Sequence, residues 1–146
     1  MDHCHEVNII LSSTIEREGR AEETQLYIQG QFFIKGDAYY LKYKENVEDF
    51  GEVDHTIRIK NNEGLILRKG AIEMRQPLVV GASREGTYKS PIGVMQTLVD
   101  AECCDVQWLE DCGEGLITIR YDLYMQGESF GRVTLIYQLK TISKKW

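Results

Sequence analysis

Residues 116–139 read LITIRYDLYMQGESFGRVTLIYQL, and this stretch decides the fold class. Apolar and polar side chains alternate through Ile117–Met125 and again through Val133–Leu139. A period of two places every second side chain on the same face of a strand, as in a sheet with one buried face. The segment Gln126-Gly127-Glu128 between the two runs is a turn signal. The stretch therefore predicts two antiparallel strands that bury one face.

The same alternation recurs along most of the chain. Short turn signals at Gly36-Asp37 and at 61–64 separate some of the runs, and Gly30 is expected to mark a bend or a bulge. Two acidic segments, residues 46–53 and 102–115, interrupt the pattern and are predicted to be loops. The other predicted strands contain Val7–Ile15, Leu26–Ile34, Tyr39–Lys44, Ile57–Lys60, Leu65–Leu67, Met74–Gly81 and Val94–Ala101.

The composition favours strands over helices. The chain has 146 residues with nine Val, fourteen Ile and eight Thr but only five Ala, which excludes an all-helical bundle. We predict one all-β domain over residues 1–146, with residues 1–6 frayed. Because a long antiparallel meander loses its edges when it closes, an up-and-down β-barrel of about eight to ten strands is favoured over a sandwich.

Charge and cysteine usage exclude several classes of function. The chain carries 23 Asp and Glu against 17 Lys and Arg, a net charge of −6, which argues against a nucleic-acid binder. No apolar run is long enough for a membrane span, and the first residues lack the pattern of a secretory signal. We therefore expect a cytoplasmic protein, in which the thiols of Cys4, Cys103, Cys104 and Cys112 are free.

Several strings resemble one protein family. They are Tyr39-Tyr40-Leu41-Lys42-Tyr43-Lys44-Glu45, Leu67-Arg68-Lys69-Gly70-Ala71, Tyr88-Lys89-Ser90-Pro91-Ile92-Gly93 and Tyr121-Asp122-Leu123. Together they are similar to the YwiB-like family of small, uncharacterised bacterial proteins, over roughly residues 7–140. The resemblance implies a lipocalin-like (calycin) β-barrel and a cytoplasmic setting in Gram-positive bacteria. It implies no particular activity.

Arg68 is the first candidate binding residue. It shares a strand face with Ile66 and opposes Leu65 and Leu67, so either face could be the interior. An interior guanidinium needs a partner, and Glu45 near the end of the Tyr39–Lys44 strand is a candidate. Such an ion pair is more probable than a ligand contact, although an interior Arg also suits an anionic ligand group.

Three tyrosines complete the candidate site. Tyr43, Tyr88 and Tyr121 lie at strand positions, and each offers an apolar ring with a polar tip to a cavity in the barrel. The alternative for each tyrosine is ordinary packing between strands, which is the commoner role.

The sequence predicts no metal, cofactor or catalytic residue. His3-Cys4-His5 is the nearest approach to a metal motif, but three consecutive residues do not readily form a tetrahedral site. No nucleophile–base pair and no nucleotide loop is recognisable, so an enzyme is the least favoured class.

Two functions remain open. The first is a binding module that holds a small apolar, amphipathic or anionic molecule inside the barrel. The second is a filled barrel that acts as a structural or protein-interaction module. Its partner would be a basic protein, attracted by the acidic segments, or a second copy of the chain.

Overall fold

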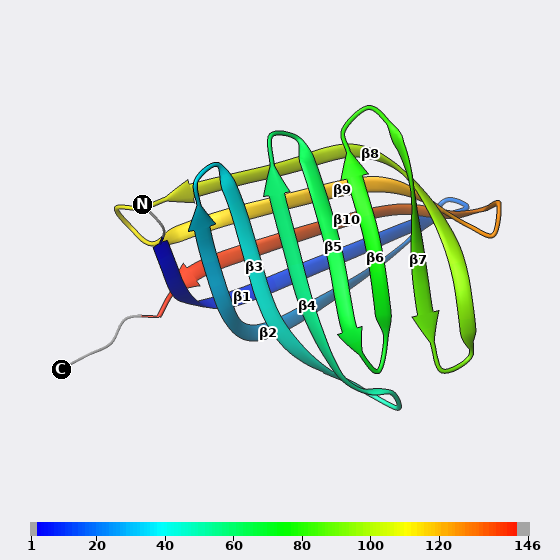
Figure 1. Cartoon of the computed structure of the whole chain (residues 1–146), viewed down its shortest axis with the longest axis horizontal. Coiled ribbons are helices and arrows are strands. Elements are labelled where there is room, and N and C mark those ends of the chain that lie inside the picture. Colours follow the sequence, from blue (N-terminus) through cyan, green and yellow to red (C-terminus); the bar gives the residue numbers. More distant parts are fainter. Residues whose placement is uncertain (1–2, 143–146) are drawn as a thin grey trace.

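The computed structural model describes residues 3–142, and these form one closed antiparallel barrel (Figure 1). Every strand pairs with its neighbours in the sequence, and the last strand pairs with the first. The prediction of an up-and-down barrel is confirmed, at the upper end of the expected strand number. The strands are β1 (His3–Arg17), β2 (Arg20–Lys35), β3 (Ala38–Val47), β4 (Gly51–Lys60), β5 (Glu63–Gly70), β6 (Glu73–Val79), β7 (Ser83–Ser90), β8 (Gly93–Leu109), β9 (Glu114–Met125) and β10 (Glu128–Thr141).

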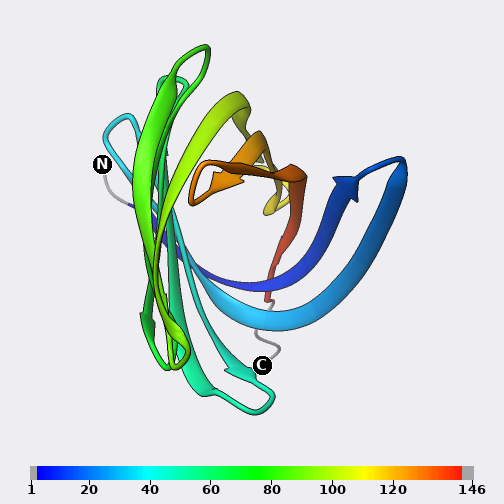
Figure 2. The same ribbon diagram turned by 90° about the vertical axis from the view of Figure 1, so that its right-hand side faces the viewer.

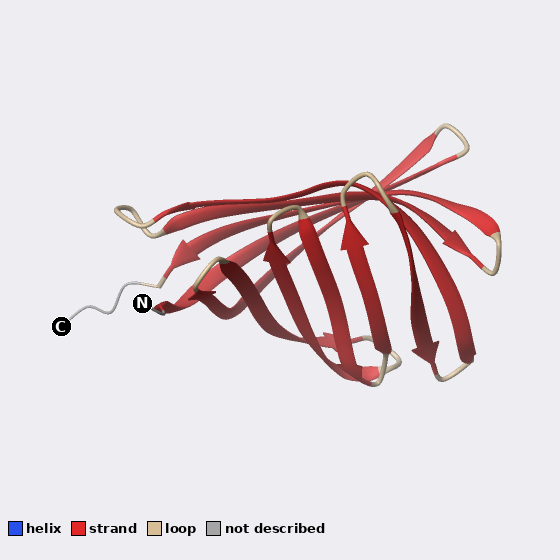
Figure 3. Cartoon of the chain, turned by 45° about the horizontal axis from the view of Figure 1, so that its top comes forward, coloured by secondary structure: helices blue, strands red, loops and turns tan. Residues whose placement is uncertain are grey.

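The barrel consists of two groups of strands that cross each other. Strands β8, β9, β10 and β1 run along the long axis of the molecule, and β3–β7 cross them steeply (Figures 1 and 3). Viewed from the end, the β1–β2 hairpin extends away from the crossing strands (Figure 2). The described part of the chain has no helix that could cross a membrane.

Gly30 lies where β2 passes from one group to the other. The part of β2 before Gly30 pairs only with β1, and from Gly30 onward β2 also pairs with β3. A Cβ at this position would lie 2.4 Å from the carbonyl oxygen of Lys42 and 2.9 Å from a methyl group of Ile9. Only glycine allows this close approach of β2 to β3.

The core lies inside the barrel and follows the predicted alternation. The central interior positions are buried, among them Ile9, Phe32, Leu41 and Ile119. Partly buried apolar side chains pack against this core, as listed here: Ile15, Leu26, Ile28, Ile34, Tyr39, Val80, Tyr88, Val106, Trp108, Met125 and Phe130.

Both predicted acidic loops are wrong. The segment 46–53 is reduced to a turn at 48–50 between β3 and β4. The segment 102–115 belongs mostly to β8 and β9, with a turn only at 110–113. A bulge between Ala101 and Cys103 inserts one residue into β8. The side chains of Val99 and Ala101 point into the barrel before the bulge, and that of Cys104 does so after it, so the alternation changes phase at the bulge.

The start of the chain is also more ordered than expected. The segment His3–Glu6, predicted to be frayed, pairs with β2 from Ile34 back to Gln31. The His5 ring packs against Trp108, with centroids 5.0 Å apart, which accounts for the order of this segment. Residues 1 and 2 lie outside the described residues.

One part of the barrel wall is held by a side chain. The backbone ladder between β6 and β7 covers only Glu73–Arg75 against Thr87–Lys89. Beyond it, the fully buried Gln76 donates hydrogen bonds from Nε2 to the carbonyl oxygens of Pro77 (2.9 Å) and Arg84 (3.2 Å). Its Oε1 accepts a hydrogen bond from the Thr97 hydroxyl. Gln76 therefore joins β6, β7 and β8 where the backbone ladder is missing.

We predict that Gln76→Leu lowers the free energy of unfolding by about 2–4 kcal/mol, because two carbonyls and a hydroxyl lose their buried partner. Urea denaturation measures the change. The matched control is Gln138→Leu at an exposed position of β10, with an expected change below about 0.5 kcal/mol. Equal changes in the two variants would show that Gln76 does not hold the wall.

Candidate functional site

A continuous interior row crosses five strands and contains most of the predicted site residues. The strand registers pair Tyr43 with His55, His55 with Arg68, Arg68 with Met74, and Met74 with Tyr88. Side chains that are directly opposite on neighbouring strands lie on the same face. We call this set the interior row. It joins residues that are far apart in the sequence.

Arg68 lies on the interior face of the barrel. Ile66, two residues earlier on β5, is buried, whereas Leu65 and Leu67 point outward and remain partly exposed. This arrangement decides between the two faces that the sequence left open. Arg68 is half-buried, and the buried part of its guanidinium, Nε, lies on the same face as the interior row.

The expected ion pair between Arg68 and Glu45 does not form. Within residues 3–142 no carboxylate lies within 4.0 Å of the Arg68 guanidinium nitrogens, and its buried Nε has no hydrogen-bond partner. Glu45 instead interacts with His55, whose Nε2 lies 2.9 Å from Oε1. Since a buried donor without an acceptor is costly, Arg68 is an unusual residue of this barrel.

His55 is a neutral partner of Glu45. Burial and, to a smaller extent, the positive charge of Arg68 together lower the pKa of His55 to about 4. Neutral His55 donates a hydrogen bond from Nε2 to the Glu45 carboxylate, and its ring stacks on Tyr43 with centroids 4.5 Å apart. Glu45 is therefore hydrogen-bonded by a neutral donor and forms no direct ion pair with Arg68.

The tyrosines around Arg68 remain protonated. Burial raises the pKa of Tyr43 to about 12, and it also raises the pKa of Tyr121 and of Tyr137. The Arg68 charge opposes this rise in all three residues, which places their hydroxyls within its electrostatic reach. Three neutral hydroxyls and one cation thus face the same interior region.

The structure brings together the five predicted residues and adds two. Arg68, Tyr43, Glu45, Tyr88 and Tyr121 all occupy interior positions, as judged from their strand registers. His55 and Tyr137 were missed, although each is in phase with buried neighbours, Ile57 and Leu135 respectively. This phase was visible in the sequence and could have found both.

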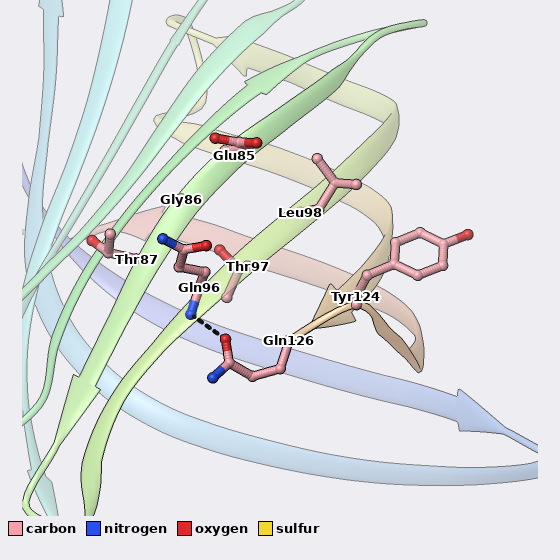
Figure 4. A pocket seen from close by; sticks show the side chains of 9 residues that line it. Glu85, Gly86, Thr87, Gln96, Thr97, Leu98, Tyr124 and Gln126 are labelled. Carbon is pink, nitrogen blue, oxygen red and sulfur yellow. Dashed lines mark hydrogen bonds between the residues drawn. The ribbon is translucent and has the colours of Figure 1, made fainter.

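Two hollows lie on the outside of the barrel, and neither contains a group of titratable side chains arranged like a catalytic site. One, of about 700 Å³, lies over β7, β8 and the end of β9, with Glu85, Leu98 and Tyr124 along its outer face (Figure 4). Gln126 accepts a hydrogen bond there from the backbone of Gln96. The other, of about 540 Å³, lies over Gly30 and the lysines of β3. Neither is lined by Arg68.

The cysteines do not form a reactive group. All four are free thiols, and Cys104 is buried on the interior face. Burial raises the pKa of Cys104 to about 11 and also raises that of Cys103, where Asp105 adds to the effect. These thiols are therefore poor nucleophiles at neutral pH.

Comparison with known proteins agrees with this architecture. Residues 9–136 match the family model described as "Domain of unknown function (DUF1934)". The chain belongs to this family. It is 28% identical over 134 residues to the "Uncharacterized beta-barrel protein YwiB" of Bacillus subtilis (strain 168), an alignment that covers 90% of this chain and 92% of that protein.

A solved structure shows the same fold. The crystal structure of ywiB protein from Bacillus subtilis superposes with a TM-score of 0.82 at 24% sequence identity, and covers 96% of this chain and 94% of that chain. The family resemblance inferred from the sequence strings is thereby confirmed. The chain is a member of a family of uncharacterised β-barrel proteins.

The low pKa of His55 predicts a specific pH dependence of stability. The pKa is about 4 in the folded state and about 6.5 in the unfolded chain. As the pH falls from 6.5 to 4, the unfolded chain takes up a proton that the folded chain does not. The free energy of unfolding therefore falls, by up to about 3 kcal/mol from this residue.

Urea denaturation between pH 7.5 and 4.5 measures this effect in the wild type and in His55→Gln. The variant should lose stability less steeply below pH 6.5, because it lacks the titrating ring. His3→Gln, at an exposed histidine, is the matched control and should follow the wild type. Parallel pH profiles for the wild type and His55→Gln would contradict the assignment.

Proposed function

We propose that this protein binds a small amphipathic molecule with an anionic head group inside the barrel, and that Arg68 holds the head group. The observation that carries the proposal is the Arg68 guanidinium, whose buried Nε lacks a hydrogen-bond partner. A carboxylate or phosphate oxygen supplies both the missing acceptor and an ion-pair partner for Arg68.

The neighbours of Arg68 support this proposal. Met74 and Tyr88 follow Arg68 in the interior row, and in the proposed complex their apolar side chains would contact an alkyl or aromatic tail. The hydroxyls of Tyr43, Tyr121 and Tyr137 add neutral donors near the head group. Because Glu45 is hydrogen-bonded to His55, its carboxylate does not compete with the head group of a ligand for Arg68.

The same interior gives less support to a catalytic function than to binding. The thiols have raised pKa values, and His55 is neutral and held by Glu45. The groups that face the interior are suited to holding an anion and to orienting it.

We place this binding function in the cytoplasm, where four unpaired thiols are kept reduced.

Calorimetric titration with decanoate and with decanol tests the proposal. The two probes share an alkyl chain, and only decanoate carries an anionic head group. We expect decanoate to bind the wild type, and Arg68→Met to weaken its binding about tenfold to hundredfold, as for loss of a charge-assisted hydrogen bond. Decanol binding should change little in the variant.

Arg58→Met is the matched control, because Arg58 lies on the outer face of β4 and donates a hydrogen bond to Tyr40. It should bind decanoate like the wild type. Equal affinity of Arg68→Met and the wild type for decanoate would overturn the role of Arg68. Failure of both probes to bind the wild type would favour the alternative, a filled barrel that acts through its surface on a basic protein or a second copy of the chain.

Arg68→Met should also change the stability of the ligand-free protein. Replacing an interior cation that has no ion-pair partner by an apolar side chain of similar length removes a desolvation cost. We expect the free energy of unfolding to rise by about 1–2 kcal/mol in urea denaturation. A loss of stability in Arg68→Met would show that the guanidinium is a structural element of the core.

A further inference from the structure

Two histidines at the start of β1 point in the same direction. His3 and His5 are two residues apart on a strand, so their rings lie on one face, parallel within 5° and with centroids 6.3 Å apart. Cys4 lies between them on the opposite face and is exposed. The sequence argued against His3-Cys4-His5 as a set of three consecutive ligands, and the strand indeed presents only the two imidazoles together.

A third candidate ligand comes from the turn between β8 and β9. Glu110, in the turn between β8 and β9, places Oε1 3.5 Å from His5 Nε2 and 4.0 Å from His3 Nδ1. One ligand atom from each of the three residues lies within 4.8 Å of the others. A tetrahedral Zn²⁺ with bonds of about 2.0–2.1 Å holds its ligand atoms roughly 3.4 Å apart. Small movements of two exposed side chains, His3 and Glu110, reach that spacing.

The His5 imidazole is held in a fixed position and has a free nitrogen that can bind a metal ion. Its Nε2 is buried and has no hydrogen-bond partner among residues 3–142. The ring is held against Trp108, which in turn packs on Phe32 with centroids 4.7 Å apart. A buried imidazole nitrogen without a partner is costly, and a metal ion satisfies it.

Trp108 also orients the carboxylate. Its indole Nε1 donates a hydrogen bond to Glu110 Oε2, which leaves Oε1 directed at the two histidines. An outer hydrogen bond of this kind is typical of metal-binding carboxylates. The same indole therefore positions both His5 and Glu110.

We propose that His3, His5 and Glu110 bind one divalent transition-metal ion, with Zn²⁺ as the best match. Two imidazoles and one carboxylate are a common protein ligand set for Zn²⁺, and a water molecule completes the coordination. The ion connects the start of β1 to the β8–β9 turn. Nothing in this site depends on Arg68, which lies near the end of β5.

Calorimetric titration of the full chain with Zn²⁺ in the presence of a phosphine reductant tests the site. We expect one ion per chain in the wild type. Glu110→Gln, a change of nearly constant shape in an exposed turn, should weaken binding at least tenfold, and His5→Ala should do the same. Trp108→Phe should weaken binding about tenfold, because it removes the outer hydrogen bond.

Cys4→Ser, Cys112→Ser and His55→Gln are the matched controls, and each should bind Zn²⁺ like the wild type. Substitution by Co²⁺ should give only the weak visible bands of nitrogen and oxygen ligands. Intense thiolate-to-cobalt bands in the near ultraviolet would assign the ion to cysteine and overturn the proposal. Unchanged Zn²⁺ affinity in a folded Glu110→Gln variant, or no binding to the wild type, would also overturn it.

Discussion

The structure depends on the pairing of the last strand with the first. Strands β1 and β10 pair from Val7 with Thr141 to Glu16 with Arg132, and this ladder closes the barrel. Closure removes the free edges that a long antiparallel meander would otherwise expose. It also turns one face of every strand into an interior. Which residues form the core and the candidate site then depends on the phase of each strand and on the registers between neighbouring strands.

A closed apolar interior accepts a polar group at low cost only when the group is hydrogen-bonded and, if it can ionise, neutral or paired. Gln76 meets this condition, since both ends of its amide are hydrogen-bonded. His55 meets it by remaining neutral beside Glu45. Arg68 and His5 are the exceptions among residues 3–142, because the buried Nε of Arg68 and the buried Nε2 of His5 have no hydrogen-bond partner. A buried polar atom without a partner is costly, and this observation is the basis for proposing that a ligand group completes the Arg68 guanidinium.

The sequence predicts most of the fold because alternation with a period of two is a local signal. It fails where a local signal is interrupted. The bulge after Ala101 shifts the inward set of β8 by one residue, so residues 102–115 resembled a loop. The face of Arg68 was undecided because Leu65, Ile66 and Leu67 are all apolar, and the burial of Ile66 together with the register to His55 and Met74 resolves it. Likewise, the proximity of Glu110 to His5 requires the closed barrel and is absent from any local pattern.

The central claim is that Arg68 faces the barrel interior and binds the anionic group of a ligand. Nuclear magnetic resonance of the arginine Nε–H groups tests this claim most directly. With Arg68→Met used to assign its signal, the Arg68 resonance should be protected from exchange with water and should shift when decanoate is added but not when decanol is added. Rapid exchange with water, together with no response to decanoate, would contradict the account.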